Sequence, residues 1–167
     1  MIQSPPLKPS NSRSMNPIQR LLSTKCSIAA LVARLTLGLV MFPHGTQKAL
    51  GWFGGYGFTG TMGYFTGSLH IPAALAFLAI MAEFLGSLGL IVGLFSRVAA
   101  FGIAVNMVVA ILMVHRMNGF FMNWFGTQKG EGYEYHLLAL GLALVVILRG
   151  GGAASLDQAI SPRLCKE

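Results

Sequence analysis

Four long apolar stretches run through the chain, separated by segments rich in glycine, aromatic and polar residues. These stretches are Cys26–Lys48, Ile71–Phe95, Arg97–His115 and Tyr133–Leu148. Each is close to the roughly 20 residues with which an α-helix crosses about 30 Å of hydrocarbon. Their apolar runs are continuous, without the alternation of a barrel strand and without a polar face at helical spacing. The pattern therefore predicts an all-α fold, a bundle of four transmembrane helices.

The composition supports a membrane protein over the alternative of a soluble helical bundle. Hydrophobic residues make up 54% of the 167 residues and charged residues only 10%. A soluble domain usually has about a quarter charged residues. Cys26 and Cys165 lie near the two ends of the chain, so a closely spaced pair for thiol-disulfide exchange is missing and a disulfide-forming enzyme is not expected.

Basic residues predict the orientation of the helices. Four spans place both termini on one side, and most lysines and arginines fall on that side. The opposite side would hold only Lys48, Arg116 and Lys129. Cytoplasmic loops carry an excess of basic residues, so both termini are expected in the cytoplasm. The same rule accounts for the formal net charge of +7 without nucleic acid as a partner.

The ends of the chain differ from its middle. Residues 1–25 are rich in Pro, Ser and Asn and carry basic but no acidic residues, which predicts a disordered basic tail rather than a cleaved signal peptide. Residues 26–157 are then the four-helix membrane domain, and residues 158–167 a C-terminal tail.

Polar residues near the middle of the predicted spans are the first candidates for function. Arg34 in the first span and Glu83 in the second fall at similar depths when counted at 1.5 Å per residue, which predicts an intramembrane ion pair. Asn106 in the third span is placed to donate to Glu83. Charged groups inside a membrane are costly and usually functional. The alternative is a pair that only fixes helix packing.

A second polar group lies towards the opposite end of the spans. In the stretch "VMFPHGTQKALGW", Pro43 breaks the hydrogen-bond ladder of an apolar helix and is followed by several polar side chains. These side chains, together with polar residues of the third and fourth spans, predict a pocket that opens outward above Arg34, Glu83 and Asn106. The predicted pocket residues are Arg34, His44, Gln47, Lys48, Glu83, Asn106, His115, Glu134 and His136.

The chemistry of this predicted pocket suits protons or a quinone better than a metal. Histidine and glutamate titrate near neutral pH when partly desolvated, and lysine or histidine can donate to a quinone carbonyl. Glu134 and His136 are two residues apart and point to opposite faces of a helix, so no metal is predicted. Nucleotide-binding glycine motifs are absent. The sequence assigns no catalytic residue.

The loop from Gly51 to His70 combines glycines with six aromatic residues. Aromatic side chains at this depth usually anchor a protein at the membrane interface. The alternative is a re-entrant or ring-stacking lid over the pocket. Its aromatic residues are Trp52, Phe53, Tyr56, Phe58, Tyr64 and Phe65.

Four segments of the chain resemble the DoxX family of membrane proteins, together covering most of Leu31 to Asp157. They are "RLTLGLVMFPHGTQKALGWFGG", "AEFLGSLGLIVGLFSRVAA", "GFFMNW" and "GEGYEYHLLALGLALVVILRGGGAASLD". The resemblance implies a four-helix protein of the bacterial inner membrane. It also implies a set of characteristic positions, namely Arg34, His44, Gln47, Lys48, Glu83, Arg97, Glu134 and Asp157.

The predicted pocket and the resemblance together leave three hypotheses for the function. Some members of the family belong to quinone-linked sulfur-oxidising enzymes or to membrane oxidoreductase complexes, so we expect the membrane subunit of a redox complex with a quinone as cofactor. The alternatives are a carrier or binding protein for a small molecule or lipid, and a non-catalytic assembly factor. The expected partners are the lipid bilayer, soluble or membrane redox proteins, and further copies of the chain.

Overall fold

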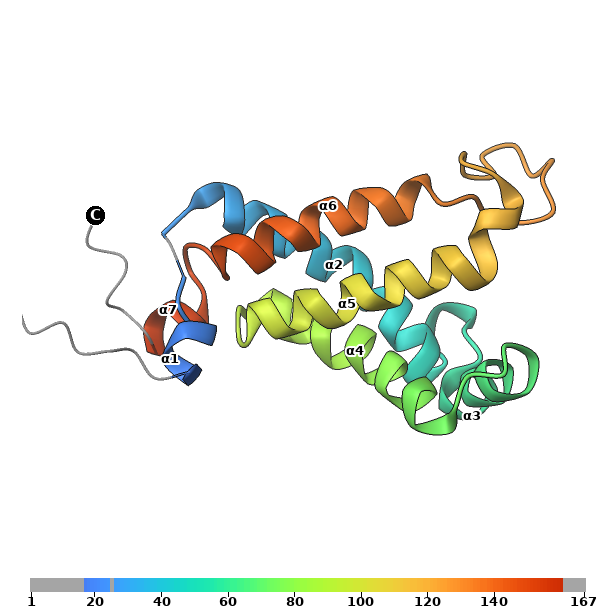
Figure 1. Ribbon diagram of the computed structural model, residues 1–167, viewed down its shortest axis with the longest axis horizontal. Coiled ribbons are helices and arrows are strands. Elements are labelled where there is room, and N and C mark those ends of the chain that lie inside the picture. The colour runs from blue at the N-terminus through green and yellow to red at the C-terminus, as the bar shows by residue number, and fades with distance from the viewer. Residues whose placement is uncertain (1–16, 25, 161–167) are drawn as a thin grey trace, which may run out of the picture.

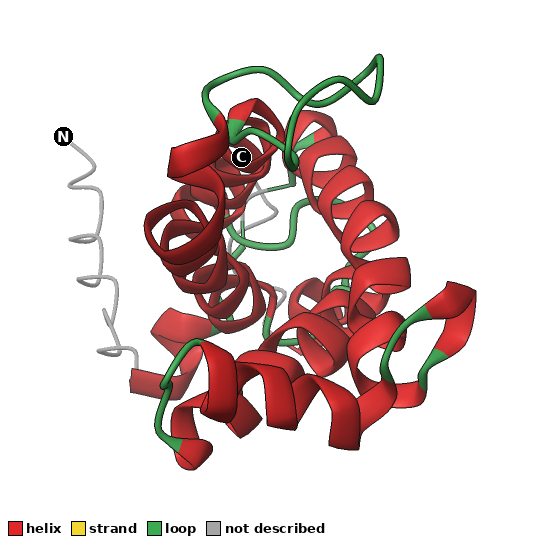
Figure 2. Ribbon diagram, turned by 90° about the vertical axis from the view of Figure 1, so that its right-hand side faces the viewer, coloured by secondary structure: helices red, strands yellow, loops and turns green. Residues whose placement is uncertain are grey.

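The computed structural model describes residues 17–24 and 26–160. Residues 1–16 and 25 of the predicted basic tail, and residues 161–167 of the predicted C-terminal tail, lie outside the described residues. All regular structure in the described part of the chain is helical, which confirms the all-α prediction (Figure 2).

The framework consists of four long helices that pack in a closed ring. They are α2 (Ile28–Leu50), α4 (Ala73–Val92), α5 (Ser96–Ala110) and α6 (Glu134–Arg149). Helix α2 packs against α4 and α6, and α5 packs against the same two helices. The π-helical turn η3 (Ile111–His115) and the short helix η4 (Arg116–Asn118) continue α5.

Three segments of the described chain are long and apolar enough to cross a membrane: α2, α4 and the continuous helix 96–118. The chain is therefore a multi-pass membrane protein. Helix α6 has 16 residues, about 24 Å at the standard rise, and is shorter than these three. Its outward face is apolar all the same, with Leu138 71% exposed.

Short elements distinguish the two ends of the bundle (Figure 1). At one end, called the α3 end, lie the loop 119–133 and a compact excursion between α2 and α4. This excursion contains η1 (Trp52–Gly54), α3 (Gly57–Gly63) and the π-helical turn η2 (Tyr64–Ser68). At the other end, called the α7 end, lie α1 (Pro17–Leu21) and α7 (Leu156–Ile160).

Two glycines set the register of α2 against α4. A Cβ on Gly38 would lie 3.0 Å from Leu90 Cβ, and a Cβ on Gly45 would lie 2.7 Å from Phe84 Cα. Real Cβ atoms do not approach backbone atoms so closely, so glycine at position 45 lets the two helices touch backbone to backbone. Gly45 therefore lies level with Glu83 and Phe84, and Gly38 lies level with Leu90 and Ile91.

Candidate functional site

Arg34 binds backbone carbonyls at the α7 end. Arg34 as a whole is 1% exposed. Nε donates to Gly151 O at 2.7 Å, and Nη2 donates to Ala154 O at 3.1 Å. Nη1 donates to the carbonyls of Leu90 and Ile91, which end α4. Arg34 thus caps α4 and holds the segment that follows α6.

The predicted ion pair between Arg34 and Glu83 is therefore wrong, because the register of α2 separates the two groups. Gly45 lies level with Glu83. Arg34 is eleven residues before Gly45, about 16 Å along the helix axis, whereas Lys48 is three residues beyond it, about 4.5 Å. Helical side chains also lean towards the N-terminus. Lys48 leans back to the level of Glu83, and Arg34 leans away from it.

Two further charged residues complete the α7 end. The carboxylate of Asp157 accepts from Phe95 N at 2.8 Å and from Ser96 N at 2.9 Å, so it caps the start of α5. Arg97 donates to the carbonyls of Ser23 and Ile147. The positions that the family resemblance implied at this end thus satisfy backbone groups where helices end, which is a structural role.

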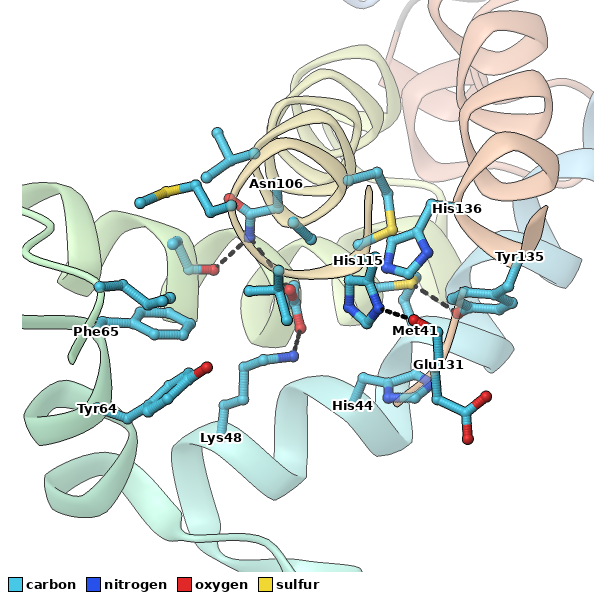
Figure 3. Close-up of a pocket in the computed structure, with 18 of the residues that line it drawn as sticks. Met41, His44, Lys48, Tyr64, Phe65, Asn106, His115, Glu131, Tyr135 and His136 are labelled. Carbon is cyan, nitrogen blue, oxygen red and sulfur yellow. Dashed lines mark hydrogen bonds and ion pairs between the residues drawn. The ribbon is translucent and has the colours of Figure 1, made fainter. Parts of the chain in front are cut away.

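A cavity of about 330 Å³ lies at the α3 end, between α2, α4, α5, α6 and the two π-helical turns. Its walls are mostly apolar, with methionine, leucine, isoleucine, valine and aromatic side chains. Six of the predicted pocket residues line it, namely His44, Lys48, Glu83, Asn106, His115 and His136. In Figure 3, Tyr64 and Phe65 lie on one side of Lys48. On the other side lie His115, His136 and Tyr135.

The acidic group of this cavity pairs with Lys48. Lys48 Nζ forms an ion pair with Glu83 Oε2, and their side chains are 29% and 7% exposed. Asn106 Nδ2 donates to Ala79 O at 2.7 Å and lies 3.4 Å from Glu83 Oε1. Asn106 therefore joins α5 to α4 beside the carboxylate, as the sequence predicted. Both oxygens of Glu83 are occupied, one by a cation and one by an amide.

Histidine and tyrosine rings form a second polar group in the same cavity. The rings of His115 and His136 lie 4.1 Å apart, and those of His44 and Tyr135 lie 5.8 Å apart. His115 Nδ1 is 2.8 Å from the carbonyl oxygen of Glu131, which fixes its ring. Nδ1 of His136 is buried and has no hydrogen-bond partner in the described part of the chain. This nitrogen and the Lys48 ammonium are the groups best placed to bind a ligand.

Two π-helical turns border the cavity, a feature that the apolar pattern did not predict. Turn η2 contributes Tyr64 and Phe65, and η3 contributes His115. Such turns are rare and frequently occur at functional sites. The predicted aromatic loop divides accordingly: Tyr64 and Phe65 line the cavity, while Trp52, Phe53 and Tyr56 are exposed.

Two predicted pocket residues besides Arg34 lie outside this cavity. Gln47 Nε2 donates to Phe53 O at 3.2 Å, at the start of the excursion. The carboxylate of Glu134 accepts from Met122 N and Trp124 Nε1 in the loop 119–133. The pocket prediction missed Tyr135, whose hydroxyl donates to Met41 Sδ at 3.3 Å. Its only sequence signal was an aromatic residue between Glu134 and His136.

The described residues contain no group of three or more His, Cys, Asp or Glu side chains that could hold a metal ion. Lys48 and the histidines place hydrogen-bonding and proton-exchanging groups next to an apolar space.

Comparison with known proteins identifies the type of chain. A family model described as DoxX matches residues 29–116, which is more than half of the chain and runs from the start of α2 to the end of η3 and the first residue of η4. No curated protein and no solved structure matches the chain.

Proposed function

The chain belongs to the DoxX family of membrane proteins, and from this premise we propose that it is the membrane subunit of a quinone-linked redox complex. The head group of the quinone occupies the cavity at the α3 end. A partner protein supplies or receives the electrons, since the described residues offer hydrogen bonding and proton exchange only.

The proposal includes a fourth span and an orientation. Helix α6 closes the ring of helices and carries an exposed apolar face, so it crosses the membrane with the other three. Arg97 and Arg149 lie at the α7 end, which is cytoplasmic in this proposal together with both termini. The cavity then opens towards the periplasmic side of a bacterial inner membrane.

One observation carries the proposal: an apolar cavity of ligand size contains hydrogen-bond donors at its polar end. Its volume of about 330 Å³ lies at the lower end of the usual range for small-molecule sites. A quinone has an apolar ring and tail and carbonyl oxygens that accept hydrogen bonds. Lys48 and His136 are suitable donors, because Nδ1 of His136 has no other partner in the described part of the chain. Met107, Ala110 and Met113 are suitable neighbours for the apolar part.

Proton exchange at these groups fits the reaction. When a quinone is reduced, each carbonyl oxygen gains a proton as the ring gains electrons, and the reverse occurs on oxidation. His115 and His136 lie in ring contact and can exchange protons with the oxygen that they face. The pair of Glu83 and Lys48 holds the ammonium beside the same space.

Binding of short-chain ubiquinone and menaquinone analogues to the purified full-length chain tests the proposal. We expect His136→Ala to weaken binding by about tenfold, the effect of losing one hydrogen bond of about 1.4 kcal/mol. Glu83→Gln should also weaken binding, because Lys48 then loses the carboxylate that holds its ammonium beside the cavity. Gln47→Ala is the matched control, because Gln47 lies one residue from Lys48 but outside the cavity. A wild-type chain that binds neither analogue contradicts the proposal.

The two alternative functions give different results. A carrier would show Glu83-dependent uptake of its solute in proteoliposomes without any change of quinone redox state. For an assembly factor, exchanging the charges in a Lys48→Glu, Glu83→Lys double variant would restore both stability and function, because only the pairing matters. A quinone site would not survive this exchange, since the ammonium would leave its place on α2.

A further inference from the structure

A second cavity lies at the α3 end beside the first turn of α6, next to the proposed quinone cavity, with which it shares Met122 and Tyr135 as wall residues. Its volume is about 410 Å³. Its walls come from the loop 119–133 and from the start of α6. The lining residues are Phe120, Met122, Trp124, Glu134, Tyr135, Leu137 and Leu138.

Glu134 is the only charged residue that lines this second cavity. Its Oε1 accepts from Met122 N and from Trp124 Nε1, each at 3.1 Å. The only ion pair within the described residues is that of Lys48 and Glu83, so no cation of that part of the chain neutralises Glu134. Glu134 also stands in the first turn of α6, where the helix dipole favours a negative charge. Neutral N–H donors and the helix dipole thus stabilise this carboxylate, and it forms no ion pair within the described residues.

Aromatic rings surround this carboxylate. Phe120, Trp124 and Tyr135 line the same space. The faces of aromatic rings attract cations, and such rings commonly bind ammonium groups. An anion would meet the carboxylate and be repelled. A small ammonium group thus matches both features of the cavity, its charge and its aromatic walls.

The position of the second cavity indicates which kind of molecule carries the ammonium group. Leu137 and Leu138 are 45% and 71% exposed on the outward face of α6, which in a membrane protein contacts acyl chains. Trp124 is 78% exposed, as is typical of the membrane interface. We propose that this cavity binds the ammonium head group of a phospholipid, ethanolamine or choline, with its acyl chains along Leu137 and Leu138. This lipid site goes beyond the proposed redox function and does not depend on it.

Trp124 is a natural reporter of this site. The chain has two tryptophans, Trp52 and Trp124, so Trp52→Phe leaves only the one that donates to Glu134. The full-length variant is placed in phosphatidylglycerol bilayers that contain increasing fractions of phosphatidylethanolamine brominated on its acyl chains. Brominated phosphatidylglycerol serves as the reference quencher.

We expect brominated phosphatidylethanolamine to quench Trp124 at a mole fraction about three- to tenfold lower than brominated phosphatidylglycerol, as a partly exposed cation–aromatic contact allows. Glu134→Gln should make the two quenching curves coincide, and Glu134→Asp should keep most of the preference. Glu131→Gln is the matched control, because Glu131 lies in the same loop but outside this cavity. Coincident curves for the parent variant overturn the proposal, as does a preference that persists in Glu134→Gln.

A soluble amine is tested separately. Ethanolamine is added to the same variant in bilayers of phosphatidylglycerol alone. We expect no change in Trp124 emission at millimolar concentration, because the site is reached from the bilayer. If soluble ethanolamine alone reproduces the effect of the lipid, the ligand is a free amine and the assignment to a lipid is overturned.

Discussion

Lys48 and Glu83 form a pair in which the two charges are unequally shielded. The carboxylate side chain is 7% exposed and the lysine side chain 29%. Removing the lysine leaves a nearly buried anion, whereas removing the carboxylate leaves a cation that still reaches solvent. The consequences of single substitutions should therefore differ in size.

We expect Lys48→Met to lower the free energy of unfolding by about 3–5 kcal/mol, the effect of orphaning a buried charge. Glu83→Gln should cost about 1–3 kcal/mol, since the amide keeps a hydrogen bond and Lys48 is partly hydrated. Thermal unfolding in detergent micelles measures both. The double variant Lys48→Met, Glu83→Gln should be more stable than Lys48→Met alone. Equal losses for the two single variants would contradict this asymmetry.

Arg34 binds four carbonyl oxygens with one planar guanidinium. A lysine at this position keeps the charge but has a single nitrogen, which cannot reach acceptors on both sides of the fork. We expect Arg34→Lys to destabilise the chain by about 2–4 kcal/mol in the same unfolding assay. Arg116→Lys, at an exposed position, should change stability little. An Arg34→Lys variant with unchanged stability would show that a positive charge at this position is enough to stabilise the chain.

The residue types of the cavity could be predicted, but their partners could not. Glu83 and Asn106 were expected as the floor of one pocket, with other polar side chains above them. Six of the predicted residues line one cavity, namely His44, Lys48, Glu83, Asn106, His115 and His136. The predicted partner of Glu83 was wrong because Glu83 lies level with Gly45, which is eleven residues and about 16 Å beyond Arg34 along α2. The direction in which helical side chains lean would have favoured Lys48.

At the scale of helices, α2 and α4 are joined by close backbone contact at Gly45. A methyl group there would lie 2.7 Å from Phe84 Cα and 2.8 Å from Glu83 O. The contact also brings Glu83 and Lys48 within reach of each other. Helix packing and the ion pair thus depend on the same residue.

We expect Gly45→Ala to push the helices apart and lower the free energy of unfolding by about 1–3 kcal/mol, as overpacking does elsewhere. Gly141→Ala is the matched control. A Cβ on Gly141 would have no heavy atom within 4 Å, so the alanine should be neutral or raise stability by about 0.5–1 kcal/mol. Equal effects of the two substitutions in thermal unfolding would contradict the contact argument.

The stagger of α2 and α4 explains why depth was hard to predict from the apolar pattern. Centring each stretch in the membrane assumes that the helices start level with each other. The excursion with α3 and η2 instead lies between them, and it shifts α4 relative to α2. Such an offset depends on the three-dimensional path of the loop, which hydropathy does not encode.

At the scale of the whole molecule, the two ends of the bundle differ in what their polar side chains contact. At the α7 end, Arg34, Arg97 and Asp157 bind backbone groups. At the α3 end, polar side chains face a cavity and two π-helical turns. The apolar stretches predicted the helices of the framework, because burial in lipid demands them. The π-helical turns and the hydrogen bonds that brace the loop 119–133 had no comparable sequence signal.

Reporter fusions test the proposed orientation. A green fluorescent protein at the C-terminus should fluoresce, since it folds well only in the cytoplasm. Alkaline phosphatase inserted after Lys129 should be active, because the loop 119–133 lies outside the cytoplasm in our proposal and this enzyme needs export. The opposite pattern, a dark fluorescent protein at the C-terminus and an inactive phosphatase after Lys129, would reverse the bundle.

The partners of Arg34 have a consequence for biosynthesis. Two of its acceptors, Gly151 and Ala154, are 117 and 120 residues further along the chain. While the ribosome is still translating the middle of the protein, this guanidinium has no permanent acceptors there and must stay hydrated near the translocon. Final assembly of the nascent chain therefore waits for the segment between α6 and α7, and a product truncated before Gly151 should be a substrate for membrane proteases.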